Sequence, residues 1–556
     1  EAFQLQVTYG LPADDRVLIT IVDARGGQQD EYSLVSNTRG VTLSASSEPG
    51  VFYGLATFAQ ILRQSGPSIP CFRITDRPDF QSRGVMLDIS RCKVPTMETL
   101  RQLIDDLAAL KYNQVQLYTE HTFAFENHRV VWADASPTTA SDIVELGGWC
   151  RDRYIELIPN LNSFGHFERW LRHPEYHSYA ECPDGFTHPF SGGRVEFGST
   201  LQPNRQSLAL LSELYDEYLP LFESSQFNVG GDEPWELGQG ASKRECERRG
   251  TTAVYVDFMS RIQKLVEARH HTMMFWSDIV LREPECLNVL SRELIALNWG
   301  YEGNHPFKKE CAQVAAAGIP FYVCPGTSSW NTLTGRTANV QANLANAARN
   351  GKATGALGYL VTDWGDGGHH QYLPISYQGF LLGACHAWNH RGTAKIDVGD
   401  GVDRAFFDRE NANAGDILVR LGRALELVPS KIRNATLFNR LLFWSMQHEP
   451  TAADRVTAAQ LGDCDDELAA IRGSLTTIQG RDASLVRAEL ENAVDLARHG
   501  IHRLQCHRKL RKDRATLREE LAIAIGRHES LWLARNRPGG LHESSARLRQ
   551  SLADLT

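Results

Sequence analysis

The spacing of hydrophobic positions changes twice along the chain and divides it into three regions. In the first, short apolar runs such as VLITIVD (17–23) and YSLVS (32–36) have the composition of strands. Gly50 then introduces VFYGLATFAQILRQ, whose apolar residues recur at helical spacing. This pattern predicts a small α+β domain over residues 1–76.

From residue 84, β-rich apolar runs alternate with amphipathic stretches. The expected strands are VMLDIS (85–90), NQVQLY (113–118), IELIPNL (155–161), QFNVGG (226–231), TMMFWSDI (272–279), LIALNWGY (294–301), PFYVCPG (320–326) and YLVTDWG (359–365). Residues 97–112 and 206–222 are the clearest helices between them, and the helix after Asp278 is expected to be short. Eight β units with intervening helices predict a (β/α)8 TIM barrel of class α/β over residues 77–400.

After about residue 400 the strand signals stop. Residues 417–427, 465–478 and 485–510 have helical patterns, which predict a C-terminal helical domain over residues 401–556. The segment RNRPGGLHES (535–544) leaves two alternatives open. It is either a basic loop between helices or a segment beside the active site or a partner subunit.

Composition narrows the range of functions. The chain has 556 residues, a net charge of -9 and a pI near 6.1, which argues against a nucleic-acid binder. Apolar runs fall short of the roughly 20 residues of a membrane span, so no membrane association is expected. The first residues, EAFQLQV, lack the form of a signal peptide but resemble the interior of a strand, so the localisation stays open. A homodimer is also left open.

Polar and aromatic residues gather where the predicted strands end. Barrel enzymes place their active sites at the carboxyl ends of the strands. Tryptophans beside carboxylates and an arginine suit a carbohydrate pocket, because aromatic faces pack on sugar C–H groups and charged groups bind hydroxyls. The candidate substrate-binding residues are Arg91, Glu120, His166, Trp276, Trp299, Tyr322, Trp330, Trp364 and Asp366.

Two pairs of adjacent residues are candidate metal ligands. Glu120-His121 and His369-His370 could bind a metal together with Asp366. Neither pair is part of an H-x-x-x-H motif or has a matching third ligand, so we expect no metal and no cofactor.

The segment NVGGDEP (228–234) is the central motif. Adjacent residues of a regular strand face opposite sides, so Asp232 and Glu233 can share a pocket only if the chain turns there. Gly230, Gly231 and Pro234 permit such a turn. Two close carboxylates would separate in pKa, leaving one ionised and one able to act as an acid.

Together, these motifs resemble the family-twenty glycoside hydrolases, the β-N-acetylhexosaminidases. The resemblance covers about residues 31–390. It rests on GVFYGLATFAQIL (50–62), RGVMLDISR (83–91), IPNLNSFGH (158–166), VGGDE (229–233), FWSD (275–278), LNW (297–299) and TDWGD (362–366).

The resemblance implies a retaining exo-enzyme whose substrate supplies its own nucleophile. Glu233 would protonate the glycosidic oxygen, and Asp232 would orient the 2-acetamido group as it forms an oxazolinium-type intermediate. Arg91 and Asp366 would bind sugar hydroxyls. Tyr322 would donate to the acetamido oxygen.

The tryptophans at 276, 299 and 364 would wall the pocket. The substrate would be a glycan with a terminal β-linked GlcNAc or GalNAc.

Some positions depart from the family pattern. Cys324 stands where the family has an aspartate, which removes an acceptor for sugar hydroxyls. Two alternatives are a non-catalytic sugar-binding relative and a chitinase-like barrel hydrolase. The presence of both carboxylates argues against the first, and the absence of D-x-x-D-x-D-x-E argues against the second.

Overall fold

The computed structural model describes residues 19–23, 27, 29–65, 69–188, 192–430, 432–510 and 513–555. They form two compact units that divide between Gln81 and Ser82. The first predicted strand covers residues 17–23, and its residues 17 and 18 lie outside the described residues. The boundaries that we drew at residues 76 and 400 remain predictions.

The first unit is a four-stranded sheet with one helix. Its strands β1 (Ile19–Asp23), β2 (Tyr32–Asn37), β3 (Gly40–Ala45) and β4 (Phe72–Asp76) lie in the order β1-β3-β2-β4. Helix α1 (Glu48–Ser65) packs on this sheet through its small residues, since a Cβ on Gly54 would meet Leu43. The small α+β unit predicted from the sequence is therefore present.

The second unit is built on eight parallel strands. They are β5 (Ser82–Asp88), β6 (Gln114–Tyr118), β7 (Glu156–Ile158), β10 (Gln226–Asn228), β11 (Thr272–Trp276), β12 (Ile295–Trp299), β13 (Phe321–Cys324) and β14 (Gly358–Asp363). Asn228 N donates to Pro159 O at 2.9 Å, and Leu161 N donates to Asn228 O at 3.0 Å, which joins β7 to β10. The barrel predicted from the sequence is confirmed.

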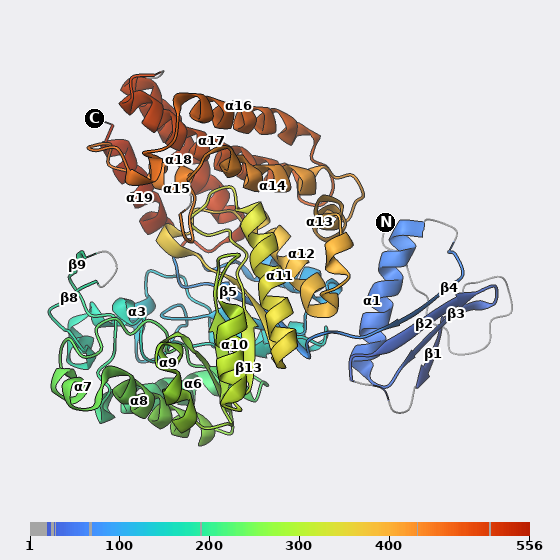
Figure 1. Ribbon diagram of the computed structural model, residues 1–556, viewed down its shortest axis with the longest axis horizontal. Helices are drawn as coiled ribbons and strands as arrows, with labels where there is room; N and C mark the ends of the chain where they lie inside the picture. The colour runs from blue at the N-terminus through green and yellow to red at the C-terminus, as the bar shows by residue number, and fades with distance from the viewer. Residues whose placement is uncertain are drawn as a thin grey trace. The chain divides into compact units, whose positions relative to one another are not determined.

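A helix follows each strand and covers the barrel (Figure 1). These helices are α2 (Met97–Ala109), α4 (Ala140–Arg151), α6 (Arg205–Tyr218), α8 (Thr251–Glu267), α9 (Asp278–Arg282), α10 (Phe307–Ala316), α11 (Thr337–Thr354) and α12 (Tyr377–Asn389). Helix α9 has only five residues, as expected for the stretch after Asp278. The loops also contain three short helices, α3 (Arg129–Trp132), α5 (Glu168–Leu171) and α7 (Lys243–Arg249). A strand pair, β8 (Phe186–Thr187) and β9 (Arg194–Val195), lies between α5 and α6 along the chain.

The chain after α12 is helical, as predicted. It contains α13 (Val398–Phe406), α14 (Ala414–Arg423), α15 (Leu437–Leu442), α16 (Ala458–Ser474), α17 (Ala483–His507), α18 (Arg514–Arg535) and α19 (Leu541–Ala553). Figure 1 shows α16, α17 and α18 running alongside one another. Among the described helices, none combines the length and apolar character needed to cross a membrane.

Candidate active site

The turn after β10 brings the two adjacent carboxylates to one side. Gly230, Gly231 and Glu233 have positive φ angles of 70°, 86° and 50°. A Cβ on Gly230 would lie 1.8 Å from Asn162 Oδ1, so this position requires glycine for space as well as for conformation. The chain therefore turns at Gly230 and Gly231, as the sequence predicts.

His166, which follows β7, lies against both carboxylates. Its Nε2 is 3.3 Å from Asp232 Oδ2 and 3.7 Å from Glu233 Oε2. Burial disfavours the imidazolium, but the ion pair with Asp232 outweighs burial and raises the pKa of His166 to about 10. Asp232 therefore has a cationic partner.

Glu233 has a different environment from its neighbour. Burial raises the pKa of Glu233 to about 7, while His166 lowers it and the charge of Asp232 raises it. Its side chain is 30% exposed, against 8% for Asp232. At neutral pH, Glu233 can thus exist as an acid, and its side chain is the more exposed of the two.

Arg91 is held firmly at the end of strand β5. Its Nη2 lies 3.1 Å from Glu120 Oε1 and 3.3 Å from His166 Nδ1, and its guanidinium stacks over Trp364 at 5.1 Å. Asp88 Oδ1 accepts from the backbone N–H of Arg91 at 3.1 Å, and its Oδ2 accepts from Gly365 N at 2.9 Å. These bonds tie the loops after the first and eighth barrel strands together.

Glu120 and Asp366 are two of the carboxylates that interact electrostatically with this arginine. Burial raises the pKa of Glu120 to about 7, and Arg91 opposes the shift. Tyr118 Oη donates to Glu120 Oε1 at 2.9 Å. Burial also raises the pKa of Asp366, and again Arg91 lowers it. Asp366 therefore lies within the electrostatic reach of Arg91, as its proposed role in binding hydroxyls requires.

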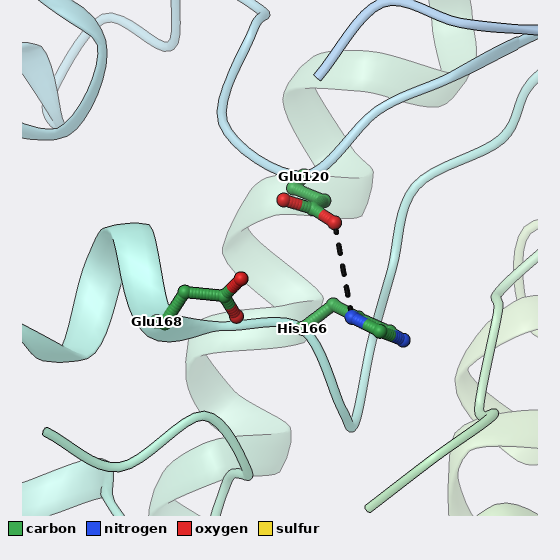
Figure 2. A group of neighbouring side chains, drawn as sticks. All are labelled: Glu120, His166 and Glu168. Atoms are coloured by element: carbon green, nitrogen blue, oxygen red, sulfur yellow. Dashed lines mark ion pairs between the residues drawn. The ribbon is translucent and has the colours of Figure 1, made fainter. Parts of the chain in front are cut away.

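Glu168, on the one-turn helix α5, joins this group and was not predicted. Figure 2 shows its carboxylate directed toward the space beside Glu120 and His166. One donor atom from each of the three side chains lies within 4.8 Å of the others, the spacing of metal ligands. Arg91 Nη2 lies against both Glu120 and His166, so a guanidinium already supplies positive charge beside these residues. We assign it no metal.

Two clusters of described residues have metal-ligand spacing. One is Glu120, His166 and Glu168, and the other is His166, Asp232 and Glu233, so His369 and His370 belong to neither. The Nε2 of His370 instead lies 3.0 Å from Ser544 O.

The signal that could have found Glu168 was its position two residues after His166.

Aromatic rings pack together at the carboxyl ends of several barrel strands. Trp276 and Trp364 lie 6.2 Å apart between centroids, and Trp299 stacks on Tyr301 at 5.1 Å. Trp364 Nε1 donates to Tyr301 Oη at 2.8 Å, and Trp330 packs edge-on against Tyr301 at 5.0 Å. Tyr301 was missed by the sequence reasoning, although it lies in the same apolar run as Trp299.

The prediction for Tyr322 is wrong. Its Oη donates to Gln226 Oε1 at 3.3 Å, and Ser82 and Gln114 are its other polar neighbours. All three residues begin barrel strands, so Tyr322 lies in the amino-terminal layer of the barrel. The hydroxyl that the structure places among the pocket tryptophans belongs to Tyr301.

The segment 535–544 lies against the loops that follow the barrel strands. Thr96 N donates to Arg535 O at 2.9 Å, and Arg537 N donates to Val94 O at 2.8 Å. Ser544 Oγ donates to Gly368 O at 2.6 Å, beside the loop that carries Asp366. Of the two alternatives, the structure supports a position next to the site.

The chain is similar to known proteins over part of its length. A β-hexosaminidase subunit A1 of Dictyostelium discoideum is 27% identical over 297 residues, and a lacto-N-biosidase of Bifidobacterium bifidum is 23% identical over 285 residues. Each match covers 50% of this chain but only 52% and 24% of the respective relative. The chain thus spans about half the length, or less, of these relatives.

A solved structure, the chitobiase of Flavobacterium johnsoniae, superposes over 96% of this chain and 91% of its own, with a TM-score of 0.58 and 18% sequence identity. At that identity the likeness shows a shared fold. The model of the glycosyl hydrolase family 20 catalytic domain matches residues 80–352, and the model of domain 2 of the same family matches residues 1–77. Since these two models together match more than half of its residues, the chain belongs to glycosyl hydrolase family 20.

Proposed function

We propose that this chain is a retaining exo-β-N-acetylhexosaminidase that removes terminal β-linked GlcNAc or GalNAc. The observation that carries the proposal is the contrast between the adjacent carboxylates. Asp232 faces a cationic His166, whereas burial keeps Glu233 able to hold a proton near pH 7. Acid–base chemistry on a glycosidic oxygen needs such a pair.

In the proposed reaction, Glu233 protonates the glycosidic oxygen as the acetamido carbonyl of the sugar attacks C1. The C1–O bond breaks, the aglycone leaves as an alcohol, and an oxazolinium forms. Asp232 accepts a hydrogen bond from the acetamido N–H and stabilises the positive charge of the oxazolinium. Glu233 then takes a proton from the water that attacks C1, which restores the acetamido group with net retention.

The remaining side chains hold the sugar. Arg91 donates to its hydroxyls and Asp366 accepts from one of them. The tryptophan rings enclose the acetamido group. Tyr301, whose Oη accepts from Trp364, donates to the acetamido oxygen in place of Tyr322.

The test is release of chromophore from aryl β-GlcNAc and aryl β-GalNAc, with the aryl β-glucoside as control. We expect both N-acetylhexosaminides to react and the glucoside to remain intact, because it lacks the internal nucleophile. A thiazoline analogue of GlcNAc should inhibit competitively, since it resembles the cyclised intermediate. Comparable rates on the glucoside would contradict substrate assistance, and no release from any of the three would favour a non-catalytic relative.

A further inference from the structure

Asp278, the first residue of α9, is a buried carboxylate with no role in the proposed reaction. Its side chain is 14% exposed, and its oxygens have no hydrogen-bond partner within 3.5 Å among the described residues, although the side chain of Trp299 lies near enough to act on them as a donor. The nearest cation is Arg282, whose Nη2 lies 3.6 Å away but whose side chain is 55% exposed. A buried charge without hydrogen bonds is costly, and one solvated arginine compensates little of that cost.

The groups that face Asp278 make its ionised form less favourable still. Asp232 and Glu233 approach from the turn after β10, Tyr255 from α8, Trp299 from β12 and Arg282 from α9 itself. Burial, followed by the charges of Asp232 and Glu233, raises the pKa of Asp278 to about 8, while Arg282 and Trp299 lower it. Burial and the neighbouring carboxylates together outweigh one cation at the edge of the site.

We propose that Asp278 is a positioning residue that keeps its proton throughout turnover, so that the negative charge beneath the acetamido group stays on Asp232. This inference rests on the proposed function. A second ionised carboxylate beside Asp232 would be repelled by it, and burial would add to that cost. In the proposed reaction, Asp232 accepts the acetamido N–H and stabilises the oxazolinium as an anion.

The test is the pH dependence of kcat/KM on aryl β-GlcNAc for the wild type and two variants, Asp278→Asn and Asp278→Ala. In the wild type, loss of the Glu233 proton and then of the Asp278 proton should steepen the alkaline limb toward a hundredfold loss per pH unit. Asn keeps the shape and the neutral state, so Asp278→Asn should show the shallower tenfold-per-unit limb of Glu233 alone. Asp278→Ala removes the group and should lose roughly 10²-fold at pH 6, as expected for a small misplacement near the reacting atoms.

Arg282→Gln provides a matched probe of the same group. Removing the cation that lowers the pKa of Asp278 should move the steep part of the limb to higher pH. Thermal melting of each variant separates these effects from unfolding. Loss of activity at pH 6 in Asp278→Asn equal to that in Asp278→Ala would show that the ionised carboxylate is needed, and it would overturn the inference. An unchanged steep limb in Asp278→Asn would do the same.

A spectroscopic measurement keeps the inference independent of turnover. The infrared difference between the wild type and Asp278→Asn at pH 6 should contain the C=O stretch of a neutral carboxylic acid, which should disappear above pH 9. Absence of that band at pH 6 would overturn the inference even if the chain hydrolyses no hexosaminide. In that case the proposed function would fail separately, through the wild-type assay alone.

Discussion

Gly165 sets the distance between the loop that carries His166 and the turn that carries the two carboxylates. A Cβ at this position would lie 2.4 Å from the carbonyl oxygen of Asp232, whereas ordinary contacts begin at 3.4 Å. Gly165→Ala must therefore separate the two segments by about 1 Å, and a misplacement of that size costs roughly 10²-fold in catalysis. We expect kcat to fall by this factor, because Asp232 and Glu233 both move relative to the sugar.

The assay is kcat and KM on aryl β-GlcNAc, with thermal melting of the same samples. Gly147→Ala is the matched control, since a Cβ on Gly147 of α4 would meet nothing within 4 Å. It should leave kcat unchanged and stabilise the helix slightly, as alanine does in place of glycine. Wild-type kcat in Gly165→Ala would refute the view that this contact positions the carboxylates.

Three other outcomes follow from the site. Glu233→Gln should reduce turnover of a natural disaccharide by ~10²–10⁴, the usual contribution of general acid–base catalysis, while sugar binding measured by calorimetry persists; near wild-type turnover would remove Glu233 from the mechanism. Because burial raises the pKa of Glu233 to about 7, the acid form is present below that pH and is lost above it. The kcat/KM profile should therefore begin to fall near pH 7, and a decline that begins near pH 4.5 would contradict this environment. With Cys324 in place of an acceptor, discrimination between β-GlcNAc and β-GalNAc should reach only ~1–3 kcal/mol, or should favour GalNAc; a thousandfold preference for GlcNAc in matched kcat/KM values would mean that another residue, with Glu168 the first candidate, supplies the acceptor.

The barrel could be predicted because its strands are buried on both faces. Such strands have nearly continuous apolar runs, as in YLVTD of β14, and the glycines and polar residues after them mark their ends. The turn at Gly230 and Gly231 could be predicted for a similar local reason, since only a turn lets Asp232 and Glu233 face one pocket. Both inferences depend on residues that are close in the sequence.

The errors at the site have a common physical cause. Alternation along a strand tells which residues point into a barrel, but it does not give their height along the barrel axis. Tyr322 points inward yet lies two residues into β13, in the amino-terminal layer, whereas Tyr301 lies beyond the end of β12 and reaches the pocket. Glu168 was missed because the one-turn helix that carries it has no periodicity of its own.

The pairing of segment 535–544 with the loop after β5 has a consequence for biosynthesis. Thr99 Oγ1 donates to Arg535 O across 436 positions of the chain, and Pro95 pairs with Asn536 as an isolated bridge. At the usual ribosomal rate of roughly 5–20 residues per second, the loop that follows Arg91 must wait about 20–90 s for these partners. The barrel strands can pair during that interval, but the mouth of the pocket cannot take its final form. A newly made chain should therefore acquire its fold before it acquires its activity, and ribosome-bound chains stalled before residue 535 should be protease-resistant in the barrel while still inactive.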